Sequence, residues 1–211
     1  MNGTIRPADI EKRSLAIITE ELGGRTFPDG VAEVVKRVIH TSADFDYADN
    51  LCFSENAVER AKAALAAGAT VVTDTNMALA GISKPALAAC GGRAVCFMAD
   101  EDVAREAKAR GVTRAAVSME KAALIEGPVI FAVGNAPTAL LRLHELIEAG
   151  ETAPALVVGV PVGFVNVVES KELFLGGNTP YIVARGRKGG SNVAAAIVNA
   201  LLYQLYAREG F

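Results

Sequence analysis

Two near-continuous apolar runs constrain what this chain of 211 residues can fold into. They are PVIFAVG at residues 128–134 and ALVVGV at residues 155–160, and each has the length of one strand. A strand that is exposed on one face alternates between apolar and polar residues, whereas a strand covered on both faces stays apolar throughout. The two runs therefore predict buried parallel strands, with helices packed on both sides of the sheet.

Strand and helix patterns alternate along the rest of the chain, which is typical of a parallel α/β sheet. Further strands are predicted at residues 69–74, 93–98 and 181–185. Helices are predicted at residues 8–23, 30–40, 57–68, 101–111, 113–125, 137–150 and 191–206. This order predicts a single domain over residues 1–211, a three-layer α/β/α fold with a mostly parallel, doubly wound sheet of about five strands.

The charge balance and the cysteines narrow the possible partners and the location. The chain has 21 Lys and Arg against 24 Asp and Glu, whereas nucleic-acid and membrane-surface binders carry a basic excess. No apolar run approaches the roughly 20 residues that span a bilayer, and the segment MNGTIRPADIEKRS lacks the apolar core of a signal peptide. Three cysteines without a C-x-x-C pair favour a reducing compartment. We expect a cytoplasmic protein that binds neither nucleic acid nor membrane.

Metal and cofactor chemistry has few residues to use. The chain contains only two histidines, His40 and His144, so a zinc or iron site is short of ligands. Asp44, Asp46 and Asp49 lack the glycine and terminal glutamate spacing of an EF-hand, and we interpret them as caps of the next helix or as partners of His40. The helix around His144 has a complete apolar face without it, which predicts a surface position. We expect no bound metal and no cofactor.

The informative loops are those that follow the strands, because open parallel sheets bind ligands beyond the carboxyl ends of their strands. They lie at residues 73–81, 134–139, 159–172 and 184–192. In the second loop, GNAPTA, Pro137 suits a first helical turn, and Asn135 or Thr138 together with the free N–H groups favours an anion. The simpler interpretation is a capped turn between strand and helix.

The last loop, RGRKGGSN, combines cations and glycines directly before a helix. Its cations are Arg185, Arg187 and Lys188, and Ser191 or Asn192 would cap the helix that follows. This composition suits a phosphate or a carboxylate, or else forms a solvated turn. Neither loop has the spacing of a dinucleotide-binding or Walker A motif. The segment GVPVGFV at residues 159–165 either walls a flat apolar ligand or packs under the sheet edge, and residues 169–172 either begin a helix or form a binding loop.

His40 is the natural proton donor or acceptor, because histidine titrates near neutrality, although a structural role is the alternative. Around it and along the chain, five segments together resemble the precorrin-8X methylmutase family, also called precorrin isomerase. They are KRVIHTSADFDY, TDTNMALAGI, GNAPTALLRL, GVPVGFVNVVESKE and GRKGGSNVAAAIVNALLY. The resemblance extends from Ile10 to Tyr206, and the second and fifth segments are similar to the cobalt-precorrin-8 methylmutase branch.

The resemblance implies a reaction, an assembly and a set of site residues. A methyl group migrates from carbon 11 to carbon 12 of the corrinoid ring, which gives cobyrinic acid from cobalt-precorrin-8 or hydrogenobyrinate from precorrin-8X. The family uses no added cofactor and works as a homodimer with its active site near the interface. Its catalytic histidine matches His40, which protonates or hydrogen-bonds a ring C nitrogen, and its substrate-binding positions match Ser14 and Arg37. We add as substrate-binding candidates Thr75, Arg114, Asn135, Lys171 and Arg187.

The residue types in the loops are those that a corrinoid substrate would need. A flat apolar ring with carboxylates at its edge needs apolar walls, Arg and Lys side chains, and helix N-termini, all of which the loops offer. Two other functions fit the same loops. One is a nucleotide- or phosphate-dependent α/β enzyme that uses GNAPTA and RGRKGGS as phosphate cradles. The other is a corrinoid carrier without catalytic activity that hands the ring to the next enzyme of the cobalamin pathway.

Overall fold

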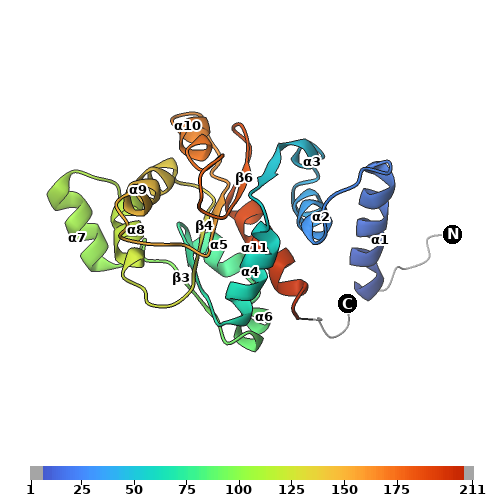
Figure 1. Cartoon of the computed structure of the whole chain (residues 1–211), viewed down its shortest axis with the longest axis horizontal. Helices are drawn as coiled ribbons and strands as arrows, with labels where there is room; N and C mark the ends of the chain where they lie inside the picture. The colour runs from blue at the N-terminus through green and yellow to red at the C-terminus, as the bar shows by residue number, and fades with distance from the viewer. Residues whose placement is uncertain (1–6, 207–211) are drawn as a thin grey trace.

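A computed structural model describes residues 7–206, shown in Figure 1. Its strands are β1 (Leu51–Phe53), β2 (Thr70–Thr73), β3 (Arg93–Val95), β4 (Val129–Val133), β5 (Leu156–Gly159) and β6 (Tyr181–Ala184). Its helices are α1 (Pro7–Glu21), α2 (Val31–Ser42), α3 (Tyr47–Asn50), α4 (Ala57–Ala66), α5 (Asn76–Gly81), α6 (Lys84–Ala89), α7 (Glu101–Arg110), α8 (Arg114–Ala123), α9 (Pro137–Glu148), α10 (Val167–Glu172) and α11 (Ser191–Tyr203). Residues 1–6, which hold part of the segment examined for a signal peptide, and residues 207–211 lie outside this description.

The six strands form one sheet in the order β1-β6-β5-β4-β2-β3. Strands β2 to β6 are parallel, which confirms the five predicted parallel strands, and β1 pairs antiparallel with β6 at the edge. Strand β1, which has only three residues, was not predicted. Because β1 is antiparallel, its first residue, Leu51, pairs with Ala184 at the carboxyl end of β6. The segment between α2 and β1 therefore lies at the same edge of the sheet as the loops that follow the parallel strands.

Helices cover both faces of the sheet, which explains why its central strands are apolar throughout. Val71, Ile130 and Val158 face a core shared with α2, α4 and α11. Their neighbours along the strands, such as Val72 and Phe131, face a second core shared with α8 and α9. The predicted three-layer, doubly wound arrangement is confirmed. Three short helices, α3, α5 and α6, were not predicted, and α10 confirms the helical one of the two interpretations of residues 169–172, with its start at Val167.

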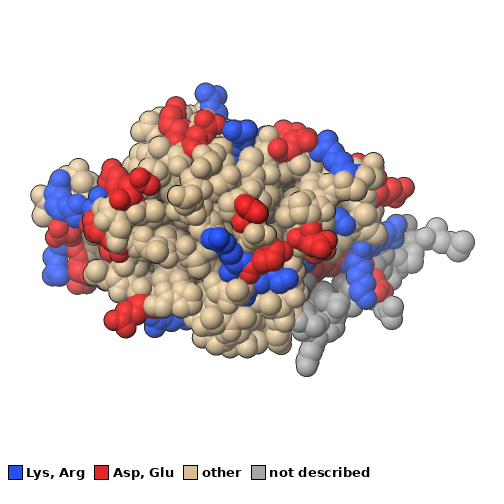
Figure 2. Space-filling view, in the orientation of Figure 1, with Lys and Arg blue, Asp and Glu red and all other residues tan. Residues whose placement is uncertain are grey.

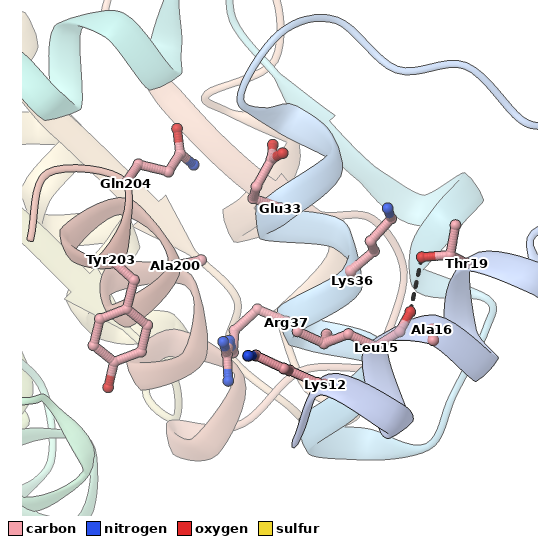
Figure 3. A pocket seen from close by; sticks show the side chains of 10 residues that line it. All are labelled: Lys12, Leu15, Ala16, Thr19, Glu33, Lys36, Arg37, Ala200, Tyr203 and Gln204. Carbon is pink, nitrogen blue, oxygen red and sulfur yellow. Dashed lines mark hydrogen bonds between the residues drawn. The ribbon is translucent and has the colours of Figure 1, made fainter. Parts of the chain in front are cut away.

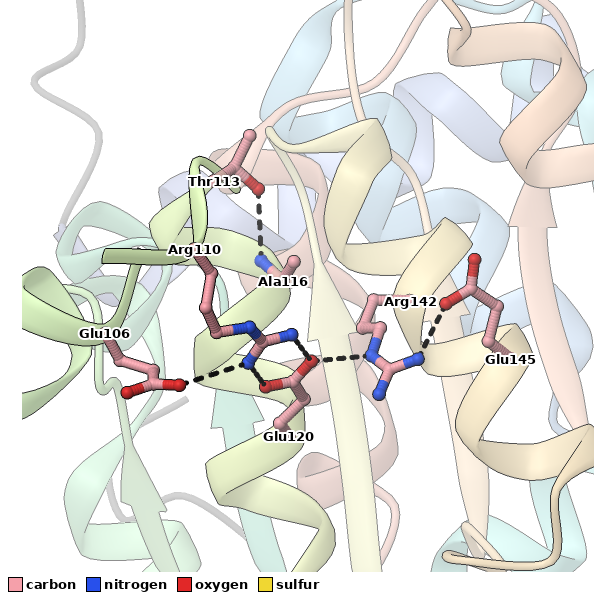
Figure 4. A network of polar contacts seen from close by, with 7 residues as sticks. All are labelled: Glu106, Arg110, Thr113, Ala116, Glu120, Arg142 and Glu145. Carbon is pink, nitrogen blue, oxygen red and sulfur yellow. Dashed lines mark hydrogen bonds and ion pairs between the residues drawn. The ribbon is translucent and has the colours of Figure 1, made fainter. Parts of the chain in front are cut away.

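A network of ion pairs joins three helices of the second layer (Figure 4). Glu120 on α8 accepts two hydrogen bonds from Arg110 on α7, at 2.5 and 2.9 Å, and one from Arg142 on α9 at 2.7 Å. The hydrogen bonds from Arg110 are the largest cause that lowers the pKa of Glu120. Elsewhere on the face in Figure 2, acidic and basic side chains are interspersed, without a broad basic area.

The doubly wound sheet changes direction between β2 and β4. From β2 the chain crosses to β3 through α5 and α6, and it returns to β4 through α7 and α8 on the opposite face. Such a switch point leaves a crevice at the carboxyl ends of the two strands, where ligands of open α/β sheets usually bind. No helix within residues 7–206 combines the length and apolar character needed to cross a bilayer.

Candidate active site

His40 lies on the exposed side of α2, near its C-terminal end. The buried side of the helix carries Val31, Val34, Val35, Val38 and Ile39, so the apolar pattern leaves His40 facing outward. The Ser14 hydroxyl on α1 lies 2.8 Å from the Nδ1 atom of His40. This contact sets the orientation of the imidazole ring and engages one nitrogen. The other nitrogen, Nε2, has no hydrogen-bond partner within the part of the chain that the structure describes, so it can meet a ligand, as a proton-transferring histidine requires.

Arg37 lies one helical turn before His40 and is held by two partners. Its Nη2 atom donates to Glu11 on α1 at 2.6 Å, and its guanidinium stacks 5.3 Å from the centre of the Tyr203 ring. The Arg37 side chain is only 16% exposed. The contacts from α1 to Arg37 and to His40 both span 26 residues of sequence. Helix α1 therefore contacts both side chains on successive turns of α2.

A pocket of about 430 Å³ lies between α1, α2 and α11, and Arg37 lines it (Figure 3). We call it the α1–α2–α11 pocket. Its lining residues are Lys12, Leu15, Ala16, Thr19, Glu33, Lys36, Arg37, Ala200, Tyr203 and Gln204. The volume falls in the lower part of the range for small-molecule sites.

The acidic residues that follow His40 do not contact it. Asp44 and Asp46 each accept a hydrogen bond from Lys188 Nζ at 2.6 Å, and Asp49 pairs with Arg25. The start of α3 has no side-chain cap. Both interpretations of this cluster, as helix caps and as partners of His40, are therefore wrong. Instead, Lys188 lowers the pKa of Asp44 by hydrogen bonding, and the pair ties the loop after β6 to the end of α2.

The crevice between β2 and β4 holds an anion that belongs to the chain itself. Asp74 is fully buried, and its carboxylate accepts hydrogen bonds from the backbone N–H groups of Gly134 at 2.9 Å, Asn135 at 2.8 Å and Ala136 at 2.7 Å. Burial raises the pKa of Asp74, and the three N–H donors oppose that rise. Neither Asn135 nor Thr138 caps α9 with its side chain. The expectation of a ligand anion at GNAPTA is thus corrected, because Asp74 takes those donors.

On the side of the crevice nearest α11, the loops after β2 and β4 pack against the start of that helix. Thr75 caps α5 by accepting from Ala78 N, and its hydroxyl lies 2.8 Å from the hydroxyl of Ser191. A Cβ atom on Gly134 would lie 2.7 Å from Ser191 Cα, so the two loops touch. The expected cap of α11 by Ser191 or Asn192 is wrong, since Gly190 occupies the N-cap position and no side chain caps the helix.

Lys171 is fully buried beneath the loop after β6. Its Nζ atom donates to the carbonyl oxygens of Gly186 and Lys188, both at 2.8 Å. Burial lowers the pKa of Lys171 to about 8. On the outside of the same loop, Arg187 is exposed and stacks 5.4 Å from the ring centre of Phe164, which is 82% exposed. The structure thus places Lys171 inside the loop and Arg187 on its surface.

The precorrin-8X methylmutase family model matches residues 9–204. The chain belongs to the precorrin-8X methylmutase family. It is 46% identical to the cobalt-precorrin-8 methylmutase of Salmonella typhimurium, over 95% of this chain and 96% of the relative. It is 44% identical to the enzyme of the same name from Priestia megaterium, over 94% and 88% of the two chains. The crystal structure of precorrin-8X methylmutase from Thermus thermophilus superposes with a TM-score of 0.84 at 40% identity, covering 92% of this chain and 96% of that one.

For a precorrin-8X methylmutase, the predicted site residues fall into groups. Ser14, Arg37 and His40 form one cluster on α1 and α2. Thr75 and Asn135 lie at the crevice between β2 and β4, and Lys171 and Arg187 belong to the loop after β6. Arg114 begins α8 and is exposed; the preceding Thr113 donates to Thr138 at 2.9 Å, so Arg114 lies beside the start of α9.

One residue of the methylmutase chain differs from its predicted surroundings. His144 is half-buried, and its ring lies edge-on to Phe174 at 5.7 Å, so the predicted surface position is wrong. Its helix packs against the segment after α10, which the apolar face alone does not reveal. Glu11, the partner of Arg37, was not predicted, because Glu11 belongs to no recognisable motif. Among residues 7–206, no three His, Cys, Asp or Glu side chains are arranged to hold a metal ion.

The depressed pKa of Lys171 predicts how the stability of the methylmutase depends on pH. The pKa is about 8 in the folded chain against 10.5 for the free side chain, so between these values unfolding takes up a proton. The free energy of unfolding of the natural protein should therefore rise relative to Lys171→Met as the pH increases from 8 to 10.5. The gain is roughly 3 kcal/mol. Urea unfolding of both proteins at several pH values measures this gain. If the difference between their free energies of unfolding stayed constant with pH, the lowered pKa of Lys171 would be contradicted.

Proposed function

We propose that this methylmutase moves a methyl group from carbon 11 to carbon 12 of cobalt-precorrin-8 and so forms cobyrinic acid. The observation that carries the proposal is the Ser14–His40 pair, which leaves His40 Nε2 without a hydrogen bond to any residue between 7 and 206, one helical turn from Arg37. Family membership supplies the reaction type, an intramolecular methyl migration. The relatives from Salmonella typhimurium and Priestia megaterium, both named for the cobalt form, support the cobalt substrate over metal-free precorrin-8X.

The proposed mechanism needs a proton and an orientation but no group from outside. The bond between the methyl group and carbon 11 breaks as its bond to carbon 12 of the same molecule forms, and the conjugated π electrons of the ring shift to restore the valence at carbon 11, so all atoms and electrons are retained. His40 Nε2 donates a proton or hydrogen bond to the ring C nitrogen and holds the ring in the reactive arrangement. Ser14 sets the direction of His40. Arg37 binds a carboxylate at the ring edge.

The remaining candidate residues lie away from the Ser14–His40 pair and have other roles. We propose that Lys171 stabilises the conformation of the loop after β6 and does not contact the substrate, because its ammonium group donates to two carbonyl oxygens of that loop. Arg187 and Phe164 offer a cation and an apolar surface on that loop. Thr75, Asn135 and Arg114 lie near the carboxyl ends of β2 and β4, where they would meet the far side of a broad ligand.

We further propose a cytoplasmic homodimer with the active site near its interface. Large apolar side chains are exposed near the carboxyl ends of the strands, which is a usual sign of a contact surface. They are Met77, Val162, Phe164 and Val165, exposed by 72%, 47%, 82% and 77%. A second copy covering these residues would shield the ring from water and assist its transfer to the next enzyme of the cobalamin pathway.

The deciding experiment is binding and single-turnover conversion followed by absorbance. We expect the protein to bind cobyrinate or hydrogenobyrinate and to ignore NAD and ATP, because Asp74 already occupies the N–H groups of a phosphate cradle. Conversion of precorrin-8X or its cobalt form separates an enzyme from a carrier. Binding of nucleotides without corrinoids would refute the proposal, and binding without turnover would favour the carrier.

Replacing Arg37 with alanine should weaken corrinoid binding. A charge-assisted hydrogen bond to a carboxylate contributes roughly 1.5–3 kcal/mol, so we expect a loss of that size in calorimetry. Arg105→Ala, at an exposed position of α7, is the matched control and should bind like the natural protein. Equal losses in the two variants would mean that total charge, and not this contact, determines affinity.

A further inference from the structure

Two ammonium groups without partners line the α1–α2–α11 pocket. Lys12 comes from α1 and Lys36 from α2. Within residues 7–206 neither side chain forms a hydrogen bond or an ion pair, whereas Arg37 in the same pocket is bound to Glu11. A cation that lines a cavity without a counter-ion is a ready contact for an anionic ligand. The lysines therefore indicate what the pocket accepts.

The surrounding charges leave the pocket positive within an acidic chain. Three cations line it against one carboxylate, Glu33, while the whole chain has a net charge of −3. Figure 3 shows Glu33 on the side of Gln204, away from Lys12 and Arg37, which point into the opposite end of the pocket. Glu11 already shares its charge with Arg37, from which it accepts a hydrogen bond. An anion can thus approach Lys12 without meeting the Glu33 carboxylate. Lys36 points toward the end of the pocket where Glu33 lies.

The position of the pocket relates it to His40. Lys36 and Arg37 precede His40 by four and three residues, so the three side chains lie on neighbouring turns of one helix face. Lys12 likewise lies two residues before Ser14, the partner of His40. A flat ring that presents a nitrogen to His40 would extend one edge over the pocket.

The walls and size of the pocket suit the edge of a ring and not a whole macrocycle. Leu15, Ala16 and Ala200 supply apolar contacts, and the Tyr203 ring forms one side under Arg37. The volume of about 430 Å³ accommodates side chains that carry carboxylates but not a complete corrinoid. Unpaired ammonium groups among apolar walls match an acetate or propionate side chain in both its methylene and its carboxylate part.

We propose that the α1–α2–α11 pocket is the subsite that binds carboxylate side chains of the corrinoid, with Lys12 and Lys36 as the residues that recognise them. This inference rests on the proposed function and adds a specificity determinant to it. It makes the pocket selective for the free acid, because a neutral ester has no negative charge and its hydrogen bond with an ammonium group lacks the attraction between opposite charges.

Calorimetry with two ligands tests the subsite. The ligands are cobyrinate and its fully methylated ester, and inorganic phosphate serves as a simple anion. The variants are Lys12→Met, Lys36→Met and the double variant, which keep the length of the side chain and remove its charge. Lys108→Met, at an exposed position of α7, makes the same change far from α1, α2 and α11.

We expect the double variant to bind cobyrinate roughly 10- to 100-fold more weakly and the ester with unchanged affinity. Lys108→Met should bind both ligands like the natural protein. Equal losses for acid and ester, or a double variant that matches Lys108→Met, would overturn the subsite. So would phosphate that displaces cobyrinate at equal concentration, because the site would then recognise any small anion. If the natural protein binds and converts no corrinoid, the proposed function itself fails, which is a distinct result.

Discussion

His40→Ala should abolish methyl migration while the fold and most of the ligand binding persist. A positioned acid or base contributes about 10²–10⁴-fold to a rate, and the proposed mechanism assigns the proton to His40 Nε2. The side chain is exposed and, within residues 7–206, its one hydrogen bond is to Ser14, so its loss removes little packing. Single-turnover conversion of precorrin-8X or its cobalt form, followed by absorbance beside a thermal melt, measures both effects.

His40→Asn serves as the comparison for that result. Asparagine cannot deliver a proton but reproduces part of the hydrogen bond, so it should retain more ligand binding than alanine does. A purely structural His40 would behave differently, because the melting temperature would fall and activity would decline only with the unfolded fraction. Near-natural turnover by folded His40→Ala would refute the acid–base mechanism.

Asp74→Asn should cause the largest loss of stability among the changes considered. The Asp74 Oδ2 atom accepts from both Asn135 and Ala136, and Oδ1 accepts from Gly134. An amide has only one oxygen, so its NH₂ group must face at least one of these buried N–H donors. Leaving buried donors without an acceptor, and opposing them with another donor, costs roughly 3 kcal/mol.

Urea unfolding measures this effect, and Asp29→Asn is the matched control because Asp29 is exposed. The control should change the free energy of unfolding by less than about 0.5 kcal/mol. A similarly small effect of Asp74→Asn would show that the carboxylate does not hold the start of α9. Turnover by the folded fraction of Asp74→Asn should remain, because Asp74 does not contact the Ser14–His40 pair.

The sequence predicts those helices and strands that are long enough to show an apolar run or a hydrophobic period. Residues 128–134 and 155–160 are apolar throughout because helices cover both sides of β4 and β5. Strand β1 has three residues and α5, α6 and α10 have six each, and such lengths are too short to establish a period. These short elements are also the ones that shape the loops at the carboxyl edge of the sheet.

The site was predictable only where its residues are close in sequence or carried by the family resemblance. Arg37 and His40 are one turn apart, so their neighbourhood follows from the helix alone. The contact of Asp74 with residues 134–136 depends on β2 lying beside β4, and strand order cannot be deduced from the strands themselves. For the same reason the sequence leaves GNAPTA open between a capped turn and an anion site, and does not indicate that Asp74 is the acceptor for its N–H groups.

Both edges of the sheet are formed by strands of only three residues, β1 and β3. An outer strand offers its unpaired N–H and C=O groups to any other chain, and a short one offers few of them. Copies of this protein therefore have little means of joining edge to edge into one continuous sheet. The brevity of β1 and β3 protects the protein from stacking into fibrils at high concentration, and it leaves helices and loops as the surfaces through which copies can associate.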